Sequence, residues 1–562
     1  MKKLPYGISS YDELIEGNYY YVDKTKYIEK LENLAEKRIM LLRPRKFGKT
    51  LFTSMLENYY DVNKKDKFEE LFKETYIGKN PTEMKNSYYI LRFNFSAIDT
   101  ENKESSIKGF RKEVASSIKL FVDNYDLDFY INNDDEAENI LNNLFKAFYI
   151  QKRNEKIYVI IDEYDHFANE LLGFKTEEFK NIISKNGKVR KWYEALKRGT
   201  EMVVDRIFIT GVAPITLDSM TSGFNIITDL TQDRTFNEMM GFTEEEVIKI
   251  MEDQEIDKEK QEELLPIMKE NYDGYRFSLK IETNNNLYNS NMCLYFLNEY
   301  MKYNEIPQKL VDTNIASDYS KIANMLRLCK SEERLEIINK TMTDEGIISE
   351  ITEKFNPEMD FKETEMVSML YYLGYLTIKD VIGGYPKLLI PNKVMKEIYG
   401  EYFLKVLSKE ENFSVDNKEY TEISLEMALE GKIEKGINLL EKYLKNLSNR
   451  DYQNFNEKYV KVIFYCIAMS LKTFWVKSEL EVEREYQDIL LVPKEAEKGY
   501  YTILIEFKYL KKDEENKLEK KQEEARNQII KYSNKEEMKA VKNLKRFTVV
   551  AVVDKIYIEE IK

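Results

Sequence analysis

The stretch RIMLLRPRKFGKTLFTSMLENYYDV, residues 38–62, decides the fold of the N-terminal half. Its opening residues, 38–44, form a short apolar run that predicts a buried strand. A basic loop with one glycine follows. After the loop, apolar side chains recur at helical spacing, so that Leu51, Met55 and Tyr59 share one face. The stretch therefore predicts a strand, a tight loop and a helix in direct succession.

Three further apolar runs predict strands, at residues 88–96, 156–162 and 206–212, and a helical stretch is expected over roughly 104–151. Strands that alternate with helices favour a mostly parallel sheet, with a ligand at the carboxyl ends of its strands. We therefore predict a multidomain α/β protein whose first domain covers residues 1–240.

The loop Arg43-Pro44-Arg45-Lys46-Phe47-Gly48-Lys49-Thr50 lies where a P-loop lies, after a strand and before a helix. The N–H groups there can hold a phosphate, Lys49 can reach the β- and γ-phosphates, and the Thr50 hydroxyl can bind Mg²⁺. We expect ATP with Mg²⁺ (or Mn²⁺) as cofactors. The residues expected to bind the nucleotide here are Arg45, Lys46, Phe47, Gly48, Lys49 and Thr50. Arg43 stands where the common pattern has glycine.

The strand at 156–162 ends in Asp162-Glu163. An acidic residue at the end of a buried strand is costly unless it serves a cation. We expect Asp162 to hold Mg²⁺ and Glu163 to act catalytically on the attacking water, with Asp165 in support. The alternative is a solvated strand end. Thr210, at the end of the next strand, is a candidate γ-phosphate sensor, or a hydroxyl bonded to the backbone.

From residue 241 the sequence reads as helices, beginning with Thr243 as an N-cap and Glu246 as its capping-box partner. Near 375–402 the pattern is helix end, strand, Gly383-Gly384 turn, strand and helix. Residues 241–400 are therefore expected to form a helical lid and a winged-helix region. The alternative is a helical domain with an incidental hairpin.

Residues 401–562 are predicted to form a third domain, in which Asp488 lies on a strand at about 487–493 and Glu506 and Lys508 lie on another at about 500–510. Residues two apart on a strand face the same side, so Glu506 and Lys508 point together while Phe507 points into the core. If the strands pair, Asp488 approaches Glu506, and the carboxylates can bind Mg²⁺ or Mn²⁺. Lys508 and the metal would then stabilise a phosphoryl transition state. The alternative is an exposed ion pair on an edge strand.

A helix at about 513–534 carries Gln528 and Tyr532 one turn apart. Basic residues are frequent around it and could hold phosphates, although interleaved glutamates favour a solvated helix face. They are Lys508, Lys511, Lys512, Lys517, Lys520, Lys521, Lys531, Lys535, Lys539, Lys542, Lys545 and Arg546.

The composition limits the chemistry. The only histidine is His166, which excludes histidine triads and multi-histidine zinc sites. Cys293, Cys329 and Cys466 are far apart and predict no disulfide framework. A net charge of −14 argues against a uniformly basic nucleic-acid binder, although a local basic groove stays open. No apolar run is long enough for a membrane span, and no secretory signal is visible, so we expect a cytoplasmic protein.

Several motifs occur in a fixed order, including YVDKT at 21–25, RPRKFGKT at 43–50, IIDEYD at 160–165, MGFTEEEV at 240–247 and YDGYRF at 272–277. Together they resemble the bacterial and archaeal AAA-ATPase-like family whose P-loop reads RPRRFGKS. The resemblance covers roughly 5–290. It implies ATP binding, makes Arg43 a family trait, and places Arg276 where a lid arginine contacts nucleotide, unless it forms a surface salt bridge.

The C-terminal pattern, over about 400–562, resembles the PD-(D/E)XK nuclease superfamily, in particular the branch with a trailing QxxxY helix. The resemblance implies that Asp488, Glu506 and Lys508 form the core site and that Glu457 is an additional metal ligand. It also implies that Gln528 and Tyr532 lie near the nucleic-acid backbone. Gln487 departs from the proline or glycine expected before the aspartate.

Two functions follow. The first is an ATP-binding, ATP-hydrolysing prokaryotic protein whose nucleotide state regulates a metal-dependent nuclease acting on nucleic acid, DNA in preference to RNA. The second is a nucleotide-dependent switch or scaffold that binds DNA or a partner protein through an inactive nuclease fold. No membrane partner is expected, and the sequence leaves a homo-oligomer open.

Overall fold

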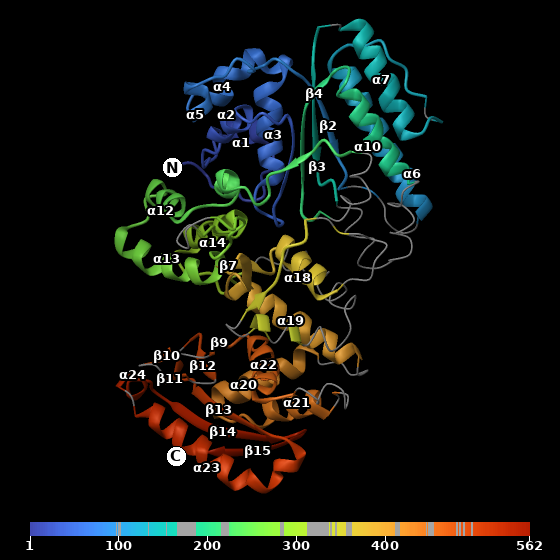
Figure 1. Ribbon diagram of the computed structural model, residues 1–562. Coiled ribbons are helices and arrows are strands. Elements are labelled where there is room, and N and C mark those ends of the chain that lie inside the picture. The colour runs from blue at the N-terminus through green and yellow to red at the C-terminus, as the bar shows by residue number, and fades with distance from the viewer. Residues whose placement is uncertain are drawn as a thin grey trace. The chain divides into compact units, whose positions relative to one another are not determined.

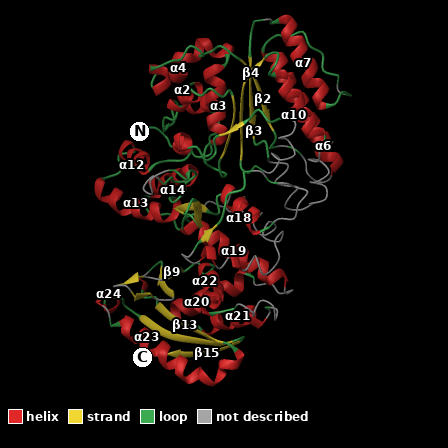
Figure 2. Ribbon diagram, viewed as in Figure 1, coloured by secondary structure: helices red, strands yellow, loops and turns green. Residues whose placement is uncertain are grey.

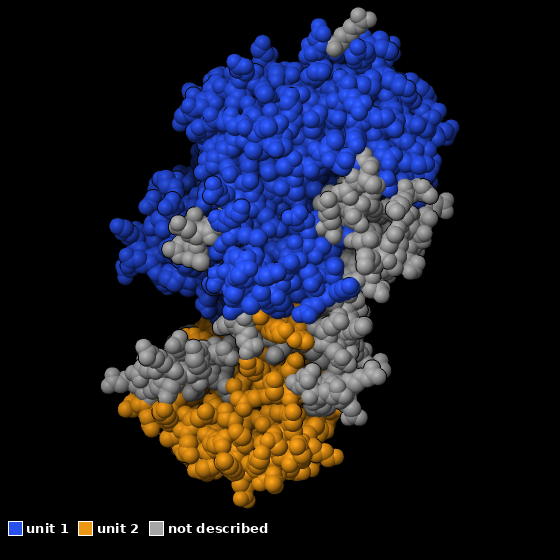
Figure 3. Space-filling view, viewed as in Figure 1, with its two compact units in different colours: residues 1–318, 347–394 blue, residues 319–346, 395–562 orange. Residues whose placement is uncertain are grey.

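A computed structural model gives the structure of the chain (Figure 1). It describes residues 1–96, 98, 103–132, 134–152, 154–165, 187–214, 224–280, 286–311, 336–337, 340–342, 346–353, 355, 362–410, 416–445, 447, 455–478, 481–482, 485–486, 489–495, 498–534 and 536–562. Figure 2 distinguishes its helices from its strands. The chain divides into two compact units, the first Met1–Asp318 with Ile347–Val394 and the second Tyr319–Gly346 with Met395–Lys562 (Figure 3).

The first unit contains a five-stranded parallel sheet in the order β2-β3-β4-β1-β5. Its strands are β1 (Arg38–Leu42), β2 (Tyr89–Asn94), β3 (Ile157–Asp162), β4 (Val204–Gly211) and β5 (Thr228–Asp229). The four predicted strands and the parallel α/β sheet are thus confirmed, and β5 was not predicted. Because all strands run the same way, the loops after β1, β3 and β4 meet at one edge.

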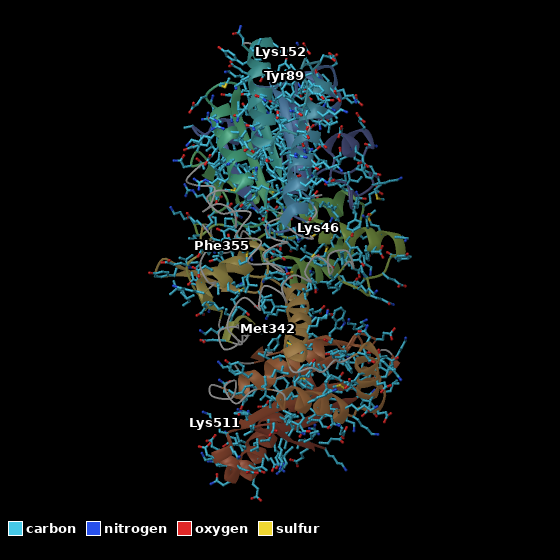
Figure 4. The ribbon with its side chains drawn as sticks, turned by 90° about the vertical axis from the view of Figure 1, so that its right-hand side faces the viewer. Lys46, Tyr89, Lys152, Met342, Phe355 and Lys511 are labelled. Atoms are coloured by element: carbon cyan, nitrogen blue, oxygen red, sulfur yellow. The ribbon has the colours of Figure 1, made fainter. Side chains whose placement is uncertain are left out.

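Helices cover both faces of this sheet. Helix α3 (Lys49–Tyr60) packs on one face, and α6 (Lys103–Asn124), α7 (Ala137–Gln151) and α10 (Lys188–Gly199) lie on the other (Figure 1). The helical stretch expected over 104–151 is two helices, because α6 ends at Asn124 and Asp126 then has a left-handed φ of 50°. In Figure 4 Tyr89 and Lys152 lie together at one end of β2, and Lys46 lies toward the other, carboxyl end.

The rest of the first unit is mostly helical. Before and after β1 come α1 (Tyr11–Glu16), α2 (Lys26–Glu32), η1 (Val62–Lys67), α4 (Phe68–Phe72) and α5 (Tyr76–Lys79). Residues 234–303, here called the lid, contain η2 (Arg234–Met239), α12 (Glu244–Asp253), α13 (Lys258–Tyr272) and α14 (Ser290–Tyr303). The predicted capping box is confirmed, since the Thr243 hydroxyl accepts from the Glu246 N–H while the Glu246 carboxylate accepts from the Thr243 N–H.

The predicted hairpin is also confirmed. Helix α18 (Glu363–Tyr372) precedes β7 (Thr377–Ile382), β8 (Tyr385–Leu389) and α19 (Lys393–Glu410). Gly383 and Gly384 form the turn with φ values of 60° and 91°, which suit glycine in a two-residue hairpin loop. Strand β6 (Ile347–Ile348) makes it a three-stranded sheet, β6-β8-β7. The third strand favours the winged-helix interpretation over an incidental hairpin. The winged-helix region and the three domain boundaries stay predictions.

The second unit contains a mixed sheet in the order β15-β14-β13-β12-β9, in which only β13 and β14 run parallel. Its elements are α20 (Asn417–Glu430), α21 (Glu434–Lys445), α22 (Glu457–Met469), β9 (Phe474–Ser478), β10 (Glu481–Val482), β11 (Glu485–Tyr486), β12 (Ile489–Pro493), β13 (Thr502–Leu510), η5 (Lys512–Lys517), α23 (Leu518–Ser533), α24 (Glu536–Lys539), β14 (Leu544–Val552) and β15 (Lys555–Glu560). Helix α23 packs on β13 and β14, and α22 packs on β13 and β9.

Across the described residues, no helix combines the length and the apolar character that a membrane crossing requires. Cys293 and Cys466 are buried free thiols. Cys329 and His166 lie outside the described residues.

Candidate functional site

The loop between β1 and α3 positions the residues predicted to bind phosphate. Gly48 has a φ of 91°, a conformation that glycine adopts without strain, and it directs the chain into α3 at Lys49. The Lys49 ammonium is buried, donates to the Pro44 carbonyl at 3.2 Å and lies 3.9 Å from Glu163 Oε1. Since the helix N-terminus also directs its N–H groups here, the loop favours an anion.

Asp162 lies at the carboxyl end of β3 and has no exposed surface, so it is not a solvated strand end. Its Oδ1 accepts from the Glu163 N–H at 3.1 Å, and its Oδ2 lies 3.5 Å from Arg92 Nη2. Burial raises the pKa of Asp162, as does the charge of Glu163, while Arg92, Lys49 and Thr50 oppose the rise. A carboxylate that is costly to ionise here would gain from a bound cation.

A cavity of about 470 Å³ opens beside these residues. The P-loop and Glu163 form one part of its wall. Three other parts complete it, namely the N-terminal residues 5–24, Asn94 and Ser96 at the carboxyl end of β2, and the lid. Glu163 reaches the cavity from a left-handed backbone conformation with a φ of 51°, which is uncommon for a residue with a side chain and is often found at functional sites.

Two other predicted residues are placed differently. Thr210 is fully buried and its hydroxyl donates to the Leu41 carbonyl at 2.9 Å. Arg276 is also buried, and its guanidinium donates to the carbonyls of Ser278 and Leu279. Neither lines the cavity, and the buried Asp162 does not line it either. The structure therefore favours the backbone-bonded alternative for Thr210, and the contact of Arg276 with nucleotide stays a prediction.

Arg43 and Asp165 both support the loops around the cavity. The Arg43 guanidinium is buried, donates to the carbonyls of Leu42, Thr231 and Phe236, and lies 4.2 Å from the centre of the Phe277 ring. Burial lowers its pKa to about 10. Arg43 thus ties the base of the P-loop to the segment after β5, which explains an arginine where glycine is common. The Asp165 carboxylate accepts from the N–H groups of Val212 and Ala213, which follow β4.

In the second unit, Glu506 and Lys508 lie on β13, an inner strand between β12 and β14. They are only 3% and 8% exposed, which excludes an exposed pair on an edge strand. Lys508 Nζ lies 2.9 Å from Glu506 Oε1. Phe507 points to the other face, where its ring packs 5.1 Å from that of Phe464 on α22. The alternation along β13 is therefore as the sequence predicted.

A third charged residue joins this pair. Glu457 is the first residue of α22, and its Oε1 lies 3.5 Å from Lys508 Nζ. Two carboxylates thus converge on one lysine, here called the Glu506 cluster, in which Glu506 and Lys508 are buried and the Glu457 side chain is 33% exposed. Asp488 and Gln487 lie outside the described residues. Ile489, the residue after Asp488, pairs with Ile505, the residue before Glu506, in the antiparallel register of β12 and β13.

Helix α23 lies over this strand, but its predicted residues differ in environment. Tyr532 is buried in a cluster with Leu490, Leu504 and Ile529, whereas Gln528 is exposed. Tyr532 thus belongs to the core, and contact of either residue with nucleic acid stays a prediction. Several of the basic residues pair with carboxylates, which favours a solvated helix face: Lys517 with Glu514, Lys521 with Glu524, and Lys545 with Glu560.

Apart from Glu163, the cavity walls outside the P-loop were not predicted. Lys24 and Ile8 come from the N-terminal segment, and Phe242 and Leu294 come from the lid. Arg92 on β2, which contacts Asp162 and pairs with Glu57 at 2.7 Å, was also missed. The one available signal was the order of motifs, since YVDKT and MGFTEEEV flank the P-loop stretch in the sequence.

Comparison with known protein families finds a match within each unit. Residues 5–221 match the family model described as "Predicted AAA-ATPase", and residues 455–561 match that of the "PD-(D/E)XK nuclease superfamily". The chain therefore contains a predicted AAA-ATPase domain and a C-terminal PD-(D/E)XK nuclease superfamily domain. A protein of Azotobacter chroococcum mcd 1, described as "Uncharacterized protein in vnfD 5'region", is 26% identical over 250 residues. The match covers 44% of each chain, so it spans less than half of that relative.

Proposed function

We propose that the cavity of the first unit binds ATP with Mg²⁺ (or Mn²⁺) and hydrolyses it. The observation that carries this proposal is that Lys49 and Thr50, at the N-terminus of α3, face the same cavity as Glu163. Its volume of about 470 Å³ suits a small-molecule ligand. The Thr50 hydroxyl and the Asp162 carboxylate are hard oxygen donors, the kind that Mg²⁺ prefers.

Each residue then has a separate task. Lys49 would neutralise the β- and γ-phosphates, and Glu163 would orient and deprotonate the attacking water. A bound Mg²⁺ would withdraw charge from the phosphate oxygens.

A binding measurement tests the nucleotide site. Lys49→Ala should abolish detectable ATP affinity in calorimetry, while Lys37→Ala, which removes a surface pair with Asp205, should leave the affinity unchanged. Equal affinities in wild type and Lys49→Ala would contradict the nucleotide site.

We further propose that the Glu506 cluster, completed by Asp488, is a metal-dependent nuclease centre that acts on nucleic acid, DNA in preference to RNA. The burial of Glu506 and Lys508, with the partly exposed Glu457 beside them, supports this, because such charges are retained where a cation and an anion bind. The carboxylates would hold Mg²⁺ or Mn²⁺, which would supply an activated water. Lys508 would stabilise the charge that develops on the scissile phosphate.

A cleavage assay tests this half of the proposal. Wild-type protein should cut DNA or RNA when Mn²⁺ or Mg²⁺ is present, and Lys508→Ala should not. Lys512→Ala provides the control, because that lysine lies on η5, after the end of β13. Equal cutting by wild type and Lys508→Ala would remove the assignment. ATP hydrolysis with no cleavage of any substrate would favour the switch or scaffold.

Finally, we propose that the nucleotide state of the first unit regulates the nuclease. Helix α19 supports this idea, because it carries the chain across the boundary between the units, from Val394 to Met395. A continuous helix can transmit a rearrangement of the lid and hairpin region to the second unit. We also propose that the protein acts in a prokaryotic cytoplasm.

A further inference from the structure

The N-terminal residues 1–24, here called the strap, form one wall of the cavity. Pro5, Ile8, Tyr21 and Val22 line it, and Lys24 lies at its end. Helix α1 anchors the strap to the P-loop helix, because the Tyr11 N–H donates to the Ser54 hydroxyl of α3 at 2.9 Å. The Tyr11 ring is fully buried. One end of the cavity wall is therefore fixed to the helix that follows the phosphate loop.

The strap also binds the lid. Lys24 Nζ lies 2.6 and 2.7 Å from the two carboxylate oxygens of Glu246, at the start of α12. At the far end of α12, the Tyr20 hydroxyl donates to Asp253 at 2.7 Å, and the Gln254 side chain donates to the Lys2 carbonyl at 3.1 Å. The strap thus runs from the P-loop helix to the lid and closes the cavity between them.

The pair of Lys24 and Glu246 differs from the other contacts between the strap and the lid because it joins opposite charges, of which Lys24 is buried and Glu246 is partly exposed. Lys24 is 8% exposed, and its third donor reaches the Glu238 carbonyl at 3.0 Å, so every donor of the ammonium is used. Glu246 meanwhile accepts from the Thr243 N–H in the capping box of α12. Separating the pair would leave a buried charge without its counterion.

The lid touches the P-loop on the other side of the cavity. The Ser290 hydroxyl donates to the Lys46 carbonyl at 3.3 Å, and the Asn291 N–H donates to the same carbonyl at 3.4 Å. Both residues begin α14 and line the cavity. At the base of the loop, the Arg43 guanidinium adds a charged contact with the Phe236 carbonyl of the lid at 2.8 Å. The P-loop and the strap therefore both hold the lid, and the Lys24–Glu246 ion pair is the charged contact on the side of the strap.

We propose that the Lys24–Glu246 pair is a latch that sets the rate at which nucleotide leaves the cavity. Lys24 is then a positioning residue, which acts by holding the lid against the strap. The inference rests on the proposed binding of nucleotide in this cavity. Because a latch resists opening, its loss raises the dissociation rate much more than it changes the association rate.

Stopped-flow fluorescence with N-methylanthraniloyl-ATP, chased by excess ATP, measures this rate in the full chain. Lys24→Met and Glu246→Gln should each raise the dissociation rate about tenfold or more and change association by less than about threefold. Lys24→Arg should keep the wild-type rate, because arginine retains the charge. Glu246→Gln keeps an acceptor for the capping box, so it tests the latch even if Lys24→Met fails to fold.

The matched control is Lys67→Met, which removes an exposed pair between Lys67 and Glu16 of the same strap at 2.6 Å. It should leave both rates unchanged. Wild-type dissociation rates in folded Glu246→Gln and Lys24→Met would overturn the latch. Failure of the wild-type protein to bind the fluorescent nucleotide would instead remove the proposed function, so the two failures are distinguishable.

Discussion

The lysines of the two sites are held in different ways. In the first unit, Lys49 donates to a backbone carbonyl of its own loop and stands 3.9 Å from Glu163, facing a cavity. In the second, Lys508 contacts Glu506 at 2.9 Å and Glu457 at 3.5 Å. The first site therefore presents a positive charge to an incoming anion. In the second, two carboxylates surround one lysine, so Lys508 must exchange a carboxylate for a phosphate.

The largest expected loss of activity is at the first site. Glu163→Gln should lower ATP hydrolysis about 10²–10⁴-fold, because the amide cannot take a proton from water. ATP affinity should change little, since Lys49 and the loop are intact. Phosphate release under saturating ATP measures the effect. Thr210→Val is the comparison, and its hydrolysis should stay near wild type, because the Thr210 hydroxyl is bonded to Leu41. A large loss in Thr210→Val would restore the sensor role.

The expected loss of activity at the second site is slightly smaller. Glu506→Gln should reduce metal-dependent cleavage about 10²–10³-fold, because one charged metal ligand and the partner of Lys508 are lost together. Titration with Mn²⁺ should show weaker metal binding as well. Glu514→Gln, which breaks only the exposed pair with Lys517, serves as the control. Unchanged cleavage in Glu506→Gln would show that the cluster is structural.

A stability effect should distinguish Arg43 from the phosphate-binding residues beside it. Arg43→Met removes the donors of three buried carbonyl groups and should destabilise the first unit by about 3 kcal/mol. Arg45→Met, in the same loop but less buried, should change stability little. Denaturant unfolding of both variants provides the measurement. Equal stabilities would mean that Arg43 does not hold the loop.

The smallest effect concerns Arg276. Because its guanidinium bonds to Ser278 and Leu279 and does not line the cavity, Arg276→Ala should change ATP affinity by less than about threefold. Calorimetric titration with ATP would decide this. A loss of tenfold or more would indicate a lid movement that brings Arg276 to the nucleotide.

Local patterns explain what the sequence predicted. The strand, loop and helix around Lys49 and the alternation of Glu506, Phe507 and Lys508 depend on neighbours in the chain, so periodicity and turn chemistry were sufficient. The cavity wall was not predictable in this way. Lys24 and Glu246 are 222 residues apart, and no local pattern indicates that they meet. Similarly, the burial of Arg276 depends on carbonyl groups whose direction a sequence does not show.

The central claim is that the nucleotide state of the first unit controls the nuclease of the second. The most direct test is the rate of Mn²⁺-dependent cleavage measured as a function of ATP concentration, in wild type and in Lys49→Ala. We predict that the wild-type rate changes with a midpoint near the ATP dissociation constant, and that Lys49→Ala cuts at one constant rate. Wild-type cleavage that ignores ATP, although ATP binds, would contradict the account.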